Sequence, residues 1–524
     1  MHYGTTGSFN TALGSCTLGA SDVNTGDSNV AVGRKTMFDN TSGAKNVGVG
    51  SSALENNTTA ACNTAVGHVA MQQNTTGANN TALGFCALRA NTTGEANVAV
   101  GDRSGLAVTT GSSNILVGER AACGLTTGSG NIVVGQGASQ ATLTGGCNTV
   151  IGYQGLLDAT SAACNIAIGY RAMFEHVDAS QNIAIGTCAL SNTTNIGNQT
   201  AVGTCALRAN TSGHSNTAFG YFAACANTTG CFNTALGREA LQTKTTGDLN
   251  TAVGYQALHL TTQGQYNTAV GGHALDAVTT ANYNTATGMN AATGVTTGCC
   301  NVAIGAGAFK GATTSSCNVI VGVCAGEGIT SSGKNTLVGY DTANAGNIGN
   351  KTVIGFCNSV SNDGNDEIVI GREIGGLGGQ SFTFGKPSNR VYNIFTSNAS
   401  WTRTSDLRLK KNIENSNLGL DFINNLRPVT YNWKASQDVD PSLTQHYNAD
   451  TNHMDTEVKM NGLIAQEVKQ ALLDSGISET DVKDYGVWEE DKQGVQQISR
   501  EMFVIPLINA IKELTKRIKD LEDK

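Results

Sequence analysis

A short internal repeat dominates the first three quarters of the chain. The motif Asn-x-Ala-aliphatic-Gly occurs at Asn10–Gly14, Asn63–Gly67, Asn165–Gly169 and Asn301–Gly305, among other places. From Gly33 to Gly339 the closing glycines stand 17 residues apart without a break. A fixed period this short predicts a solenoid, in which each coil stacks on the one before it.

One coil, numbered from its motif asparagine, can be read from Asn63–Asn79. Position 4 is aliphatic, position 8 is small and position 9 is often Leu or Met, which predicts two short strands facing one narrow core. Gly at position 15, as in Gly77, is expected to supply the positive φ of a tight turn. Because Ala replaces larger residues, the core is thin, and it would be easier to stabilise if several chains shared it.

The charge distribution divides the chain near residue 400. Of the 124 residues in 401–524, 37 are charged, against 35 of the 400 residues before them. The glycine spacing shortens to 16 after Gly339 and ends at Gly371. We therefore predict a shaft over 1–371, a connector over 372–404 and a separate module over 405–524. Some 21 steps of about 4.8 Å give a rod on the order of 100 Å, which suits reach and display better than catalysis in a pocket.

Composition argues against several classes of partner. The net charge of −8 gives no electrostatic reason to bind nucleic acid, and no apolar run is long enough for a membrane span. Met1 is not followed by a secretory signal. Because the sequence starts in mid-coil, we interpret it as truncated or as a fragment of a longer fibre.

The 15 cysteines follow the coil period. Cys147 and Cys164 precede a motif Asn, and Cys188 and Cys205 stand two residues after a motif Gly. No CxxC pair and no His at zinc spacing occur, so neither a metal nor a cofactor is expected. Cysteines one coil apart would stack with parallel Cβ vectors, which disfavours disulfides. We interpret these cysteines as small buried apolar residues in a reducing compartment.

Two further functions for the shaft are disfavoured. The Thr pairs of the turns are adjacent in sequence and point apart, so they do not form the flat ladder of an ice-binding face. No recurring carboxylate pair suggests glycoside cleavage, although a hydrolytic groove between subunits stays open as an alternative.

Three sequence blocks mark the C-terminal module. They read Ser-Asp-x-Arg-x-Lys-x-x-Ile from Ser405, Leu-x-Pro-Val-x-Tyr-x-Trp from Leu426, and Gly-x-Ile-Ala-Gln-Glu-Val from Gly462. In this order they closely resemble the C-terminal intramolecular chaperone and self-cleaving peptidase domain of phage tail fibres and endosialidase tailspikes. The resemblance covers about 120 residues. The shaft separately resembles the head repeats of trimeric autotransporter adhesins and haemagglutinin-like viral fibres.

The resemblance to the chaperone family implies a catalytic dyad. Ser405 matches the nucleophile of that family and Lys410 its general base, so the cut is expected between Thr404 and Ser405. Lys411 is a weaker candidate for the base. A lysine acts as a base near neutral pH only if burial lowers its pKa, and the family couples this burial to trimerisation.

The last 21 residues carry an independent signal for oligomers. Apolar residues step by three and four along a seam of about two and a half heptads, consisting of Val504, Leu507, Ile511, Leu514, Ile518 and Leu521. We expect a helix over about 505–523. Its a and d residues favour a dimer in isolation, whereas the resemblance implies a trimer. An amphipathic helix packed on its own domain is the alternative.

The sequence thus predicts a mostly β protein: a trimeric β-solenoid of 17-residue coils, then a small α+β domain ending in a coiled-coil helix. The expected function is a virion fibre, assembled in the host cytoplasm, that binds a host-surface glycan or protein receptor and cuts off its own chaperone. Alternatives are a non-cleaving surface adhesin or a tailspike that hydrolyses glycans. A membrane-released transcription factor would need a basic region and a membrane span, which the sequence lacks.

Overall fold

The structure is a computed structural model that describes residues 6–19, 24–343, 349–361, 366–387, 389–394, 402–403, 407–443, 447, 449–450, 452, 456–491 and 494–524. The chain divides into two compact units, Met1–Thr404 and Ser405–Lys524. We describe each unit by itself.

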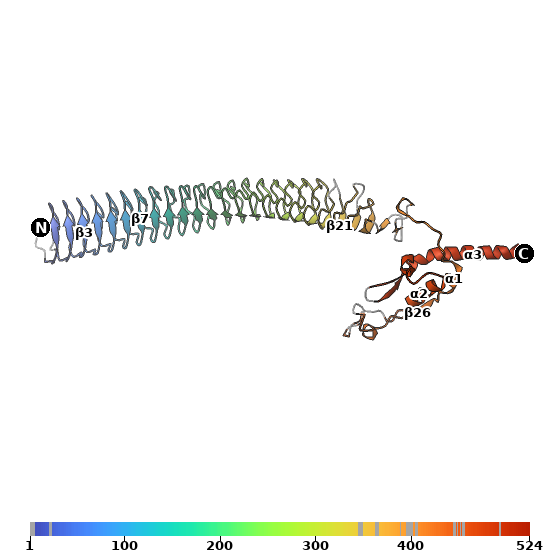
Figure 1. Ribbon diagram of the computed structural model, residues 1–524. Coiled ribbons are helices and arrows are strands. Elements are labelled where there is room, and N and C mark those ends of the chain that lie inside the picture. The colour runs from blue at the N-terminus through green and yellow to red at the C-terminus, as the bar shows by residue number, and fades with distance from the viewer. Residues whose placement is uncertain are drawn as a thin grey trace. The chain divides into compact units, whose positions relative to one another are not determined.

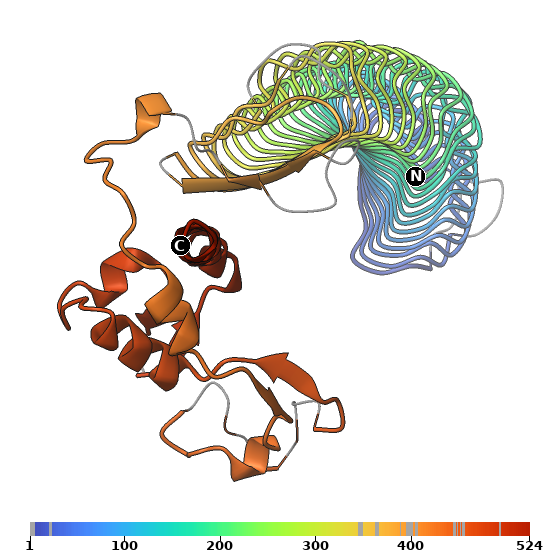
Figure 2. The same cartoon turned by 90° about the vertical axis from the view of Figure 1, so that its right-hand side faces the viewer.

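The first unit is a parallel β-solenoid of about 21 turns, drawn as a stack of coils in Figure 1. Each coil contributes one short strand that pairs in register with the next, so that Thr64 stands beside Thr81 and Ala65 beside Ala82. Seen along the stack, successive coils are progressively offset, which gives the solenoid a twist (Figure 2). The predicted β-solenoid of 17-residue coils is confirmed, but the described coils each have one strand and not the two that were expected.

The three-residue strands are β1 (Thr11–Leu13), β2 (Val30–Val32), β3 (Val47–Val49), β4 (Thr64–Val66), β5 (Thr81–Leu83), β6 (Val98–Val100), β7 (Ile115–Val117), β8 (Ile132–Val134), β9 (Thr149–Ile151), β10 (Ile166–Ile168), β11 (Ile183–Ile185), β12 (Thr200–Val202), β13 (Thr217–Phe219), β14 (Thr234–Leu236), β15 (Thr251–Val253), β16 (Thr268–Val270), β17 (Thr285–Thr287), β18 (Val302–Ile304), β19 (Val319–Val321) and β20 (Thr336–Val338). The stack continues with the longer parallel strands β21 (Lys351–Phe356), β22 (Glu367–Arg372) and β23 (Ser381–Lys386). It ends in the antiparallel strands β24 (Asn389–Ile394) and β25 (Thr402–Arg403).

The motif asparagine at position 1 closes each coil and ties it to the next. Asn63 is buried, and its Nδ2 donates to the carbonyl of Gly77 in the same coil at 3.0 Å. Its Oδ1 accepts the backbone N–H of Asn80, one coil further on, at 2.9 Å. A shorter or apolar side chain would leave both backbone groups unpaired inside the coil, which explains why this position is Asn.

Two glycine positions are required for different reasons. At position 5, Gly67 has a φ of 141°, and an added Cβ would lie 2.3 Å from the carbonyl oxygen of Gly84. At position 15, Gly77 does not adopt a positive φ, so the expected turn geometry there is wrong. It is a glycine because a Cβ would lie 2.3 Å from the carbonyl oxygen of Gly94. The positive φ angles of a coil fall instead on residues such as Val69 and Met71.

The core is as thin as expected, but one of its columns was misassigned. Positions 3, 8 and 9 point inward, and Ala65, Ala70 and Met71 are fully buried. Position 4 points outward: Val66 is 37% exposed. In a three-residue strand whose middle residue faces the core, the residues on either side must face away from it. The aliphatic column at position 4 therefore lies on the outer face of the sheet.

The second unit is a small α+β domain, as predicted. Its helices are α1 (Leu420–Asn424), α2 (Ala465–Asp474) and α3 (Val504–Glu522), with short 3₁₀ helices η1 (Leu407–Leu409), η2 (Ser436–Asp438), η3 (Val482–Tyr485) and η4 (Arg500–Phe503). Two antiparallel pairs join β26 (Val429–Tyr431) to β27 (Met460–Gly462) and β28 (Trp488–Glu490) to β29 (Gln496–Ile498). The core gathers apolar residues from α1, α2, η3 and η4, among them Phe422, Leu472, Val482 and Phe503. Among the described residues, no helix is long and apolar enough to span a membrane.

Candidate functional site

The predicted proteolytic site lies only partly within the described residues. Thr404 and Ser405 fall outside them. Lys410 follows η1, and its backbone N–H donates to the carbonyl of Leu407 at 3.1 Å. The side chains of Lys410 and Lys411 are both exposed in the single chain. A lysine base needs a less hydrated environment than this, so the single chain does not by itself provide the burial that the expected chemistry requires.

The second and third sequence blocks come together in the fold. The block from Leu426 forms β26 and the block from Gly462 continues from β27 into α2, and the two strands pair with Val429 opposite Gly462. Arg427 and Glu467, one from each block, form a two-armed ion pair in which Nε donates to Oε2 at 3.1 Å. The hydrogen bonds to Arg427 lower the pKa of the Glu467 carboxyl. The two sequence blocks do not by themselves predict this contact.

The C-terminal helix α3 packs on its own unit through one face. Pro506 and Ala510 are buried, and Asn509 Nδ2 donates to the carbonyl of Leu418 at 3.0 Å. Glu513 accepts the backbone N–H of Leu420 at 3.1 Å, which pairs one of the free N–H groups at the start of α1. The helix begins at Val504, after η4, and ends at Glu522, within a residue of the predicted bounds at each end.

The predicted seam lies on a different face of α3 and is exposed. Ile511 is 61% exposed and Leu521 is 70% exposed, and the other seam residues are also exposed: Val504, Leu507, Leu514 and Ile518. The helix therefore packs on its own domain and still leaves its apolar seam uncovered within the chain. An oligomerisation seam and a helix packed on its own domain, the two alternatives predicted from the sequence, are therefore compatible in this structure.

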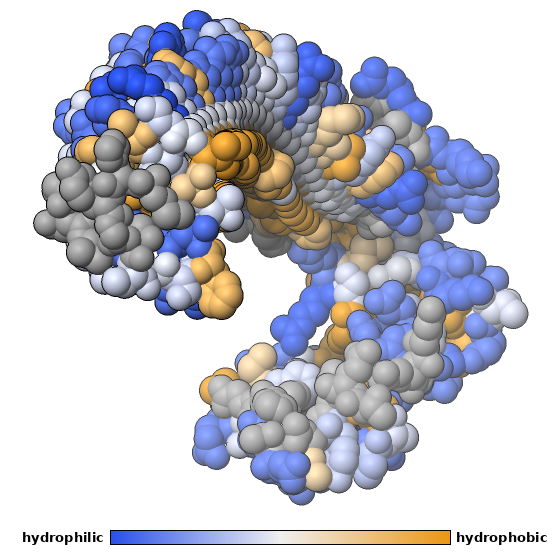
Figure 3. Space-filling model, turned by 90° about the vertical axis from the view of Figure 1, so that its left-hand side faces the viewer, coloured by the Kyte–Doolittle hydropathy of each residue, from blue (hydrophilic) through white to orange (hydrophobic). Residues whose placement is uncertain are grey.

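The shaft carries a second uncovered apolar surface. Apolar residues at position 4, and in several coils at position 2, form a band along the hollowed side of the stack, seen in orange in Figure 3. We call this band the shaft stripe. Its exposed members are Leu13, Val66, Leu83, Ile115, Ile132, Ile151, Ile166, Ile185, Phe219, Leu236, Val270, Ile304, Val319, Val338, Ile354, Ile370 and Phe384. A continuous apolar band of this length is typical of a surface that another chain covers.

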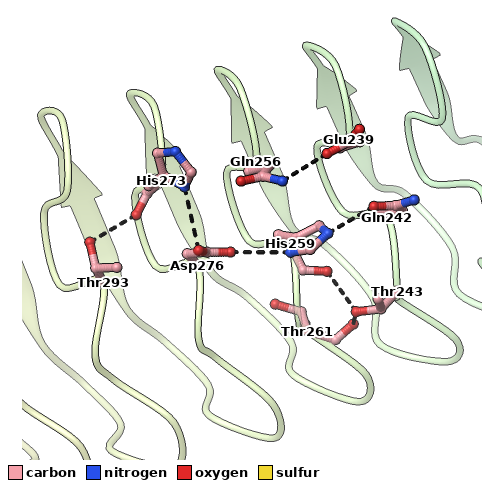
Figure 4. Close-up of polar contacts among 9 residues, drawn as sticks. All are labelled: Glu239, Gln242, Thr243, Gln256, His259, Thr261, His273, Asp276 and Thr293. Atoms are coloured by element: carbon pink, nitrogen blue, oxygen red, sulfur yellow. Dashed lines mark hydrogen bonds and ion pairs between the residues drawn. The ribbon is translucent and has the colours of Figure 1, made fainter.

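A group of titratable side chains on the shaft bridges neighbouring coils (Figure 4). Asp276 faces two imidazoles, His259 and His273, each at 3.4 Å, and His259 also contacts Gln242 Oε1 at 2.8 Å. Within the described part of the chain, no three His, Cys, Asp or Glu side chains are placed to hold a metal ion. These contacts link coil to coil along the stack, and we assign them a structural role.

The cysteines differ from the sequence interpretation in their burial. Cys86, Cys205 and Cys225 are buried, as expected. The cysteines that precede a motif Asn are instead exposed: Cys62, Cys147, Cys164, Cys300 and Cys317. Position 17 lies in the turn before the strand, where Cys62 has a φ of 60°, and its side chain is on the surface of the coil. The interpretation of that column as buried small residues is wrong.

The two units together define a class of protein: a long β-solenoid with an uncovered apolar stripe, joined to a mixed domain that ends in a helix with an uncovered seam. Residues 405–477 match the model of a peptidase family described as chaperone of endosialidase. The chain therefore has a chaperone-of-endosialidase domain at its C-terminal end, and with the solenoid shaft this fits a tail fibre with a C-terminal chaperone domain. No curated protein matches the chain.

Proposed function

We propose that this chain is the subunit of a homotrimeric virion fibre that binds a glycan or protein receptor on a host surface. Residues 405–524 act as an intramolecular chaperone that sets the trimer and then cuts itself off between Thr404 and Ser405. The observation that carries this proposal is the family match, whose first residue is Ser405, the proposed nucleophile.

The proposed cleavage is an attack by Ser405 on the peptide bond that precedes it. Lys410 takes the hydroxyl proton, and the Ser405 oxygen adds to the Thr404 carbonyl carbon. The bond to the Ser405 nitrogen breaks as that nitrogen takes up a proton, which leaves an ester between Thr404 and Ser405. Water then hydrolyses the ester, so that the chain ends at Thr404 and the chaperone begins at Ser405.

The exposure of Lys410 in the single chain suggests how the reaction is timed. A lysine side chain serves as a general base only where it is shielded from water. Neighbouring copies that cover Lys410 would supply this shielding in the assembly. Cleavage would then follow assembly and would not precede it.

The two uncovered apolar surfaces support an assembly of several identical chains. The seam of α3 offers a short interface through which copies of the C-terminal unit can associate. The shaft stripe offers a long one, in which most coils add an outward apolar side chain at position 4 and several add a second at position 2. Burying such side chains contributes about 1.5–3 kcal/mol each, so a shared stripe would stabilise the thin shaft considerably.

The direct test is a denaturing gel and an intact mass of the purified full-length protein beside Ser405→Ala and Lys410→Ala. We expect the wild type to separate at the bond before Ser405 and both variants to stay at 54.0 kDa. Lys411→Ala is the matched control and should cleave like the wild type. A trimeric wild type that stays whole would reduce the module to a permanent trimerisation cap, as in a non-cleaving adhesin.

A further inference from the structure

A second buried column runs through the shaft at position 12. In several successive coils it is Asn, and each carboxamide links to its neighbours. Asn74 Nδ2 donates to Asn57 Oδ1 at 2.9 Å and to the carbonyl of Gly77 at 3.0 Å. Asn91 Nδ2 repeats the contact to Asn74 Oδ1 at 2.8 Å. The Oδ1 of each Asn in this column thus accepts a hydrogen bond from the Nδ2 of the Asn in the next coil.

Lys244 interrupts this column. It stands between Asn227 and Thr261, and all three side chains are almost completely buried, at 1% exposure or less. Within the described residues, Lys244 Nζ, Asn227 Oδ1 and Thr261 Oγ1 have no hydrogen-bond partner. Three successive unpaired polar groups inside a close-packed coil are unusual, because each carries an uncompensated desolvation cost.

The Lys244 amine lies next to the Asn227 carboxamide. A Cβ added to Gly230 would stand 2.3 Å from Lys244 Nζ and 2.6 Å from Asn227 Oδ1, so both atoms lie against the same glycine. The carboxamide is held in place from its other end, since Asn227 Nδ2 donates to Asn210 Oδ1 at 3.1 Å and to the carbonyl of Gly230 at 3.0 Å. The Lys244 amine therefore lies within about 5 Å of the oxygen of a carboxamide that is itself held in place.

Lys351, which is also fully buried in the shaft, differs from Lys244 in having a carboxylate partner. Lys351 Nζ pairs with Glu367 Oε2 at 3.1 Å, and both side chains are fully buried. Among the residues that the structure describes, no carboxylate forms an ion pair with Lys244, and burial lowers its pKa to about 8 despite the opposing effect of Asp248. A neutral, nucleophilic amine is therefore readily reached at Lys244 near neutral pH.

We propose that Lys244 and Asn227 form an isopeptide bond that links two adjacent coils of the shaft covalently. The neutral Nζ attacks Asn227 Cγ, and an N–C bond forms. The Cγ–Nδ2 bond breaks, a proton moves from the attacking nitrogen to the leaving nitrogen, and ammonia departs. No oxidant, metal or cofactor is consumed. The product amide keeps one N–H donor in the column and removes a buried amine.

The test is an intact mass of the purified full-length protein, followed by peptide mapping. The wild type should be lighter than its sequence by one ammonia, and a branched peptide should join the segments that contain Asn227 and Lys244. Lys244→Asn restores the usual column residue, so it should fold normally and show the full sequence mass. Asn227→Thr should do the same, since Thr already occupies this column at Thr261. Lys310→Asn, which removes an exposed lysine of the shaft, is the control that keeps the deficit.

Two results would overturn the inference. One is a wild-type protein with its full sequence mass after prolonged incubation at about pH 9, where most of the Lys244 amine is neutral. The other is a deficit that persists in Lys244→Asn, because a cyclised Asn elsewhere in the chain also loses ammonia. The bond does not depend on the proposed cleavage at Ser405, so the two proposals can fail separately.

Discussion

The shaft and the C-terminal unit solve the problem of a stable fold in opposite ways. In the shaft each coil contacts only its neighbours, and the same few contacts recur: the position 1 asparagine, the buried Ala at position 3 and the close glycines. In the C-terminal unit the contacts are single events between distant segments, such as Glu513 with Leu420. A repeat is easy to extend but matches itself in many registers, whereas a unit built from unique contacts has one register. The comparison explains why a fibre of identical coils would need a separate module to align its chains.

The largest expected effect is the removal of residues 405–524. Without the module, three shafts have nothing to fix their register while the shaft stripe is exposed, so we expect aggregates or mixed oligomers instead of a trimer. Size-exclusion chromatography with light scattering would measure this. The uncut full-length Ser405→Ala protein is the control and should be trimeric. A shaft ending at Thr404 that forms the same trimer in the same yield would show that the shaft sets its own register without the C-terminal unit.

The next effect concerns the shaft stripe. Ile304 is 41% exposed in the single chain, and Ile304→Asp would place one charge per chain in the proposed interface. We expect a loss of about 2 kcal/mol or more per chain, from lost burial and from repulsion between like charges, and a lower thermal midpoint of the trimer. Thr297→Asp, on an exposed turn of the preceding coil, should leave the midpoint nearly unchanged. Equal behaviour of the two variants would mean that the stripe faces water in the assembly.

The next prediction concerns the asparagines at position 1, which tie each coil of the shaft to the next. Asn250 Nδ2 donates to the carbonyl of Gly264 at 2.9 Å, and its Oδ1 accepts the N–H of Asn267 at 3.0 Å. Asn250→Ala leaves both buried groups unpaired, and we expect a loss of about 2–4 kcal/mol per chain. Asn195→Ala, at an exposed position, should cost less than about 0.5 kcal/mol. A thermal or denaturant melt of the two variants measures this difference. Equal losses in both variants would mean that the hydrogen bonds of the position 1 asparagines do not stabilise the coil.

The smallest expected effect is a pH dependence at His176. This residue occupies position 12, its Nε2 lies 2.9 Å from the carbonyl oxygen of Ala179, and burial lowers its pKa. Because the folded shaft favours neutral His176, its contribution to stability is present above about pH 6.5 and is lost as the pH falls toward the lowered pKa. His176→Asn should therefore give a flatter dependence of the thermal midpoint on pH below that value. Parallel curves for both proteins would contradict the assignment.

The sequence predicted the shaft well because its physics is periodic. Spacing alone gave the coil length, the stacking and the inward Ala at position 8, such as Ala70. It misplaced Val66, because the larger aliphatic residue was assigned to the core, whereas the alternation of the strand turns Ala65 inward and Val66 outward. A glycine column at position 5 could have shown where the sheet turns, and so which residues face outward.

The C-terminal unit was predictable only in part. The three blocks predicted the family, and the seam of α3 could be read from heptad spacing. The contact of Arg427 with Glu467 and the packing of Glu513 on α1 could not, because each joins residues far apart in sequence with no repeating pattern. The dyad of Ser405 and Lys410 stays a prediction.

The most direct measurement of the central claim, that cleavage follows assembly, compares the cut fraction in monomers and trimers. Ile511→Asp with Ile518→Asp disrupts the seam, and Lys516→Glu, off the seam, is the control. Each protein would be separated by size, and every fraction would be run on a denaturing gel. The account predicts cut chains in the trimer fractions and whole chains of 54.0 kDa in the monomer fractions. Monomers cut as completely as trimers would contradict it.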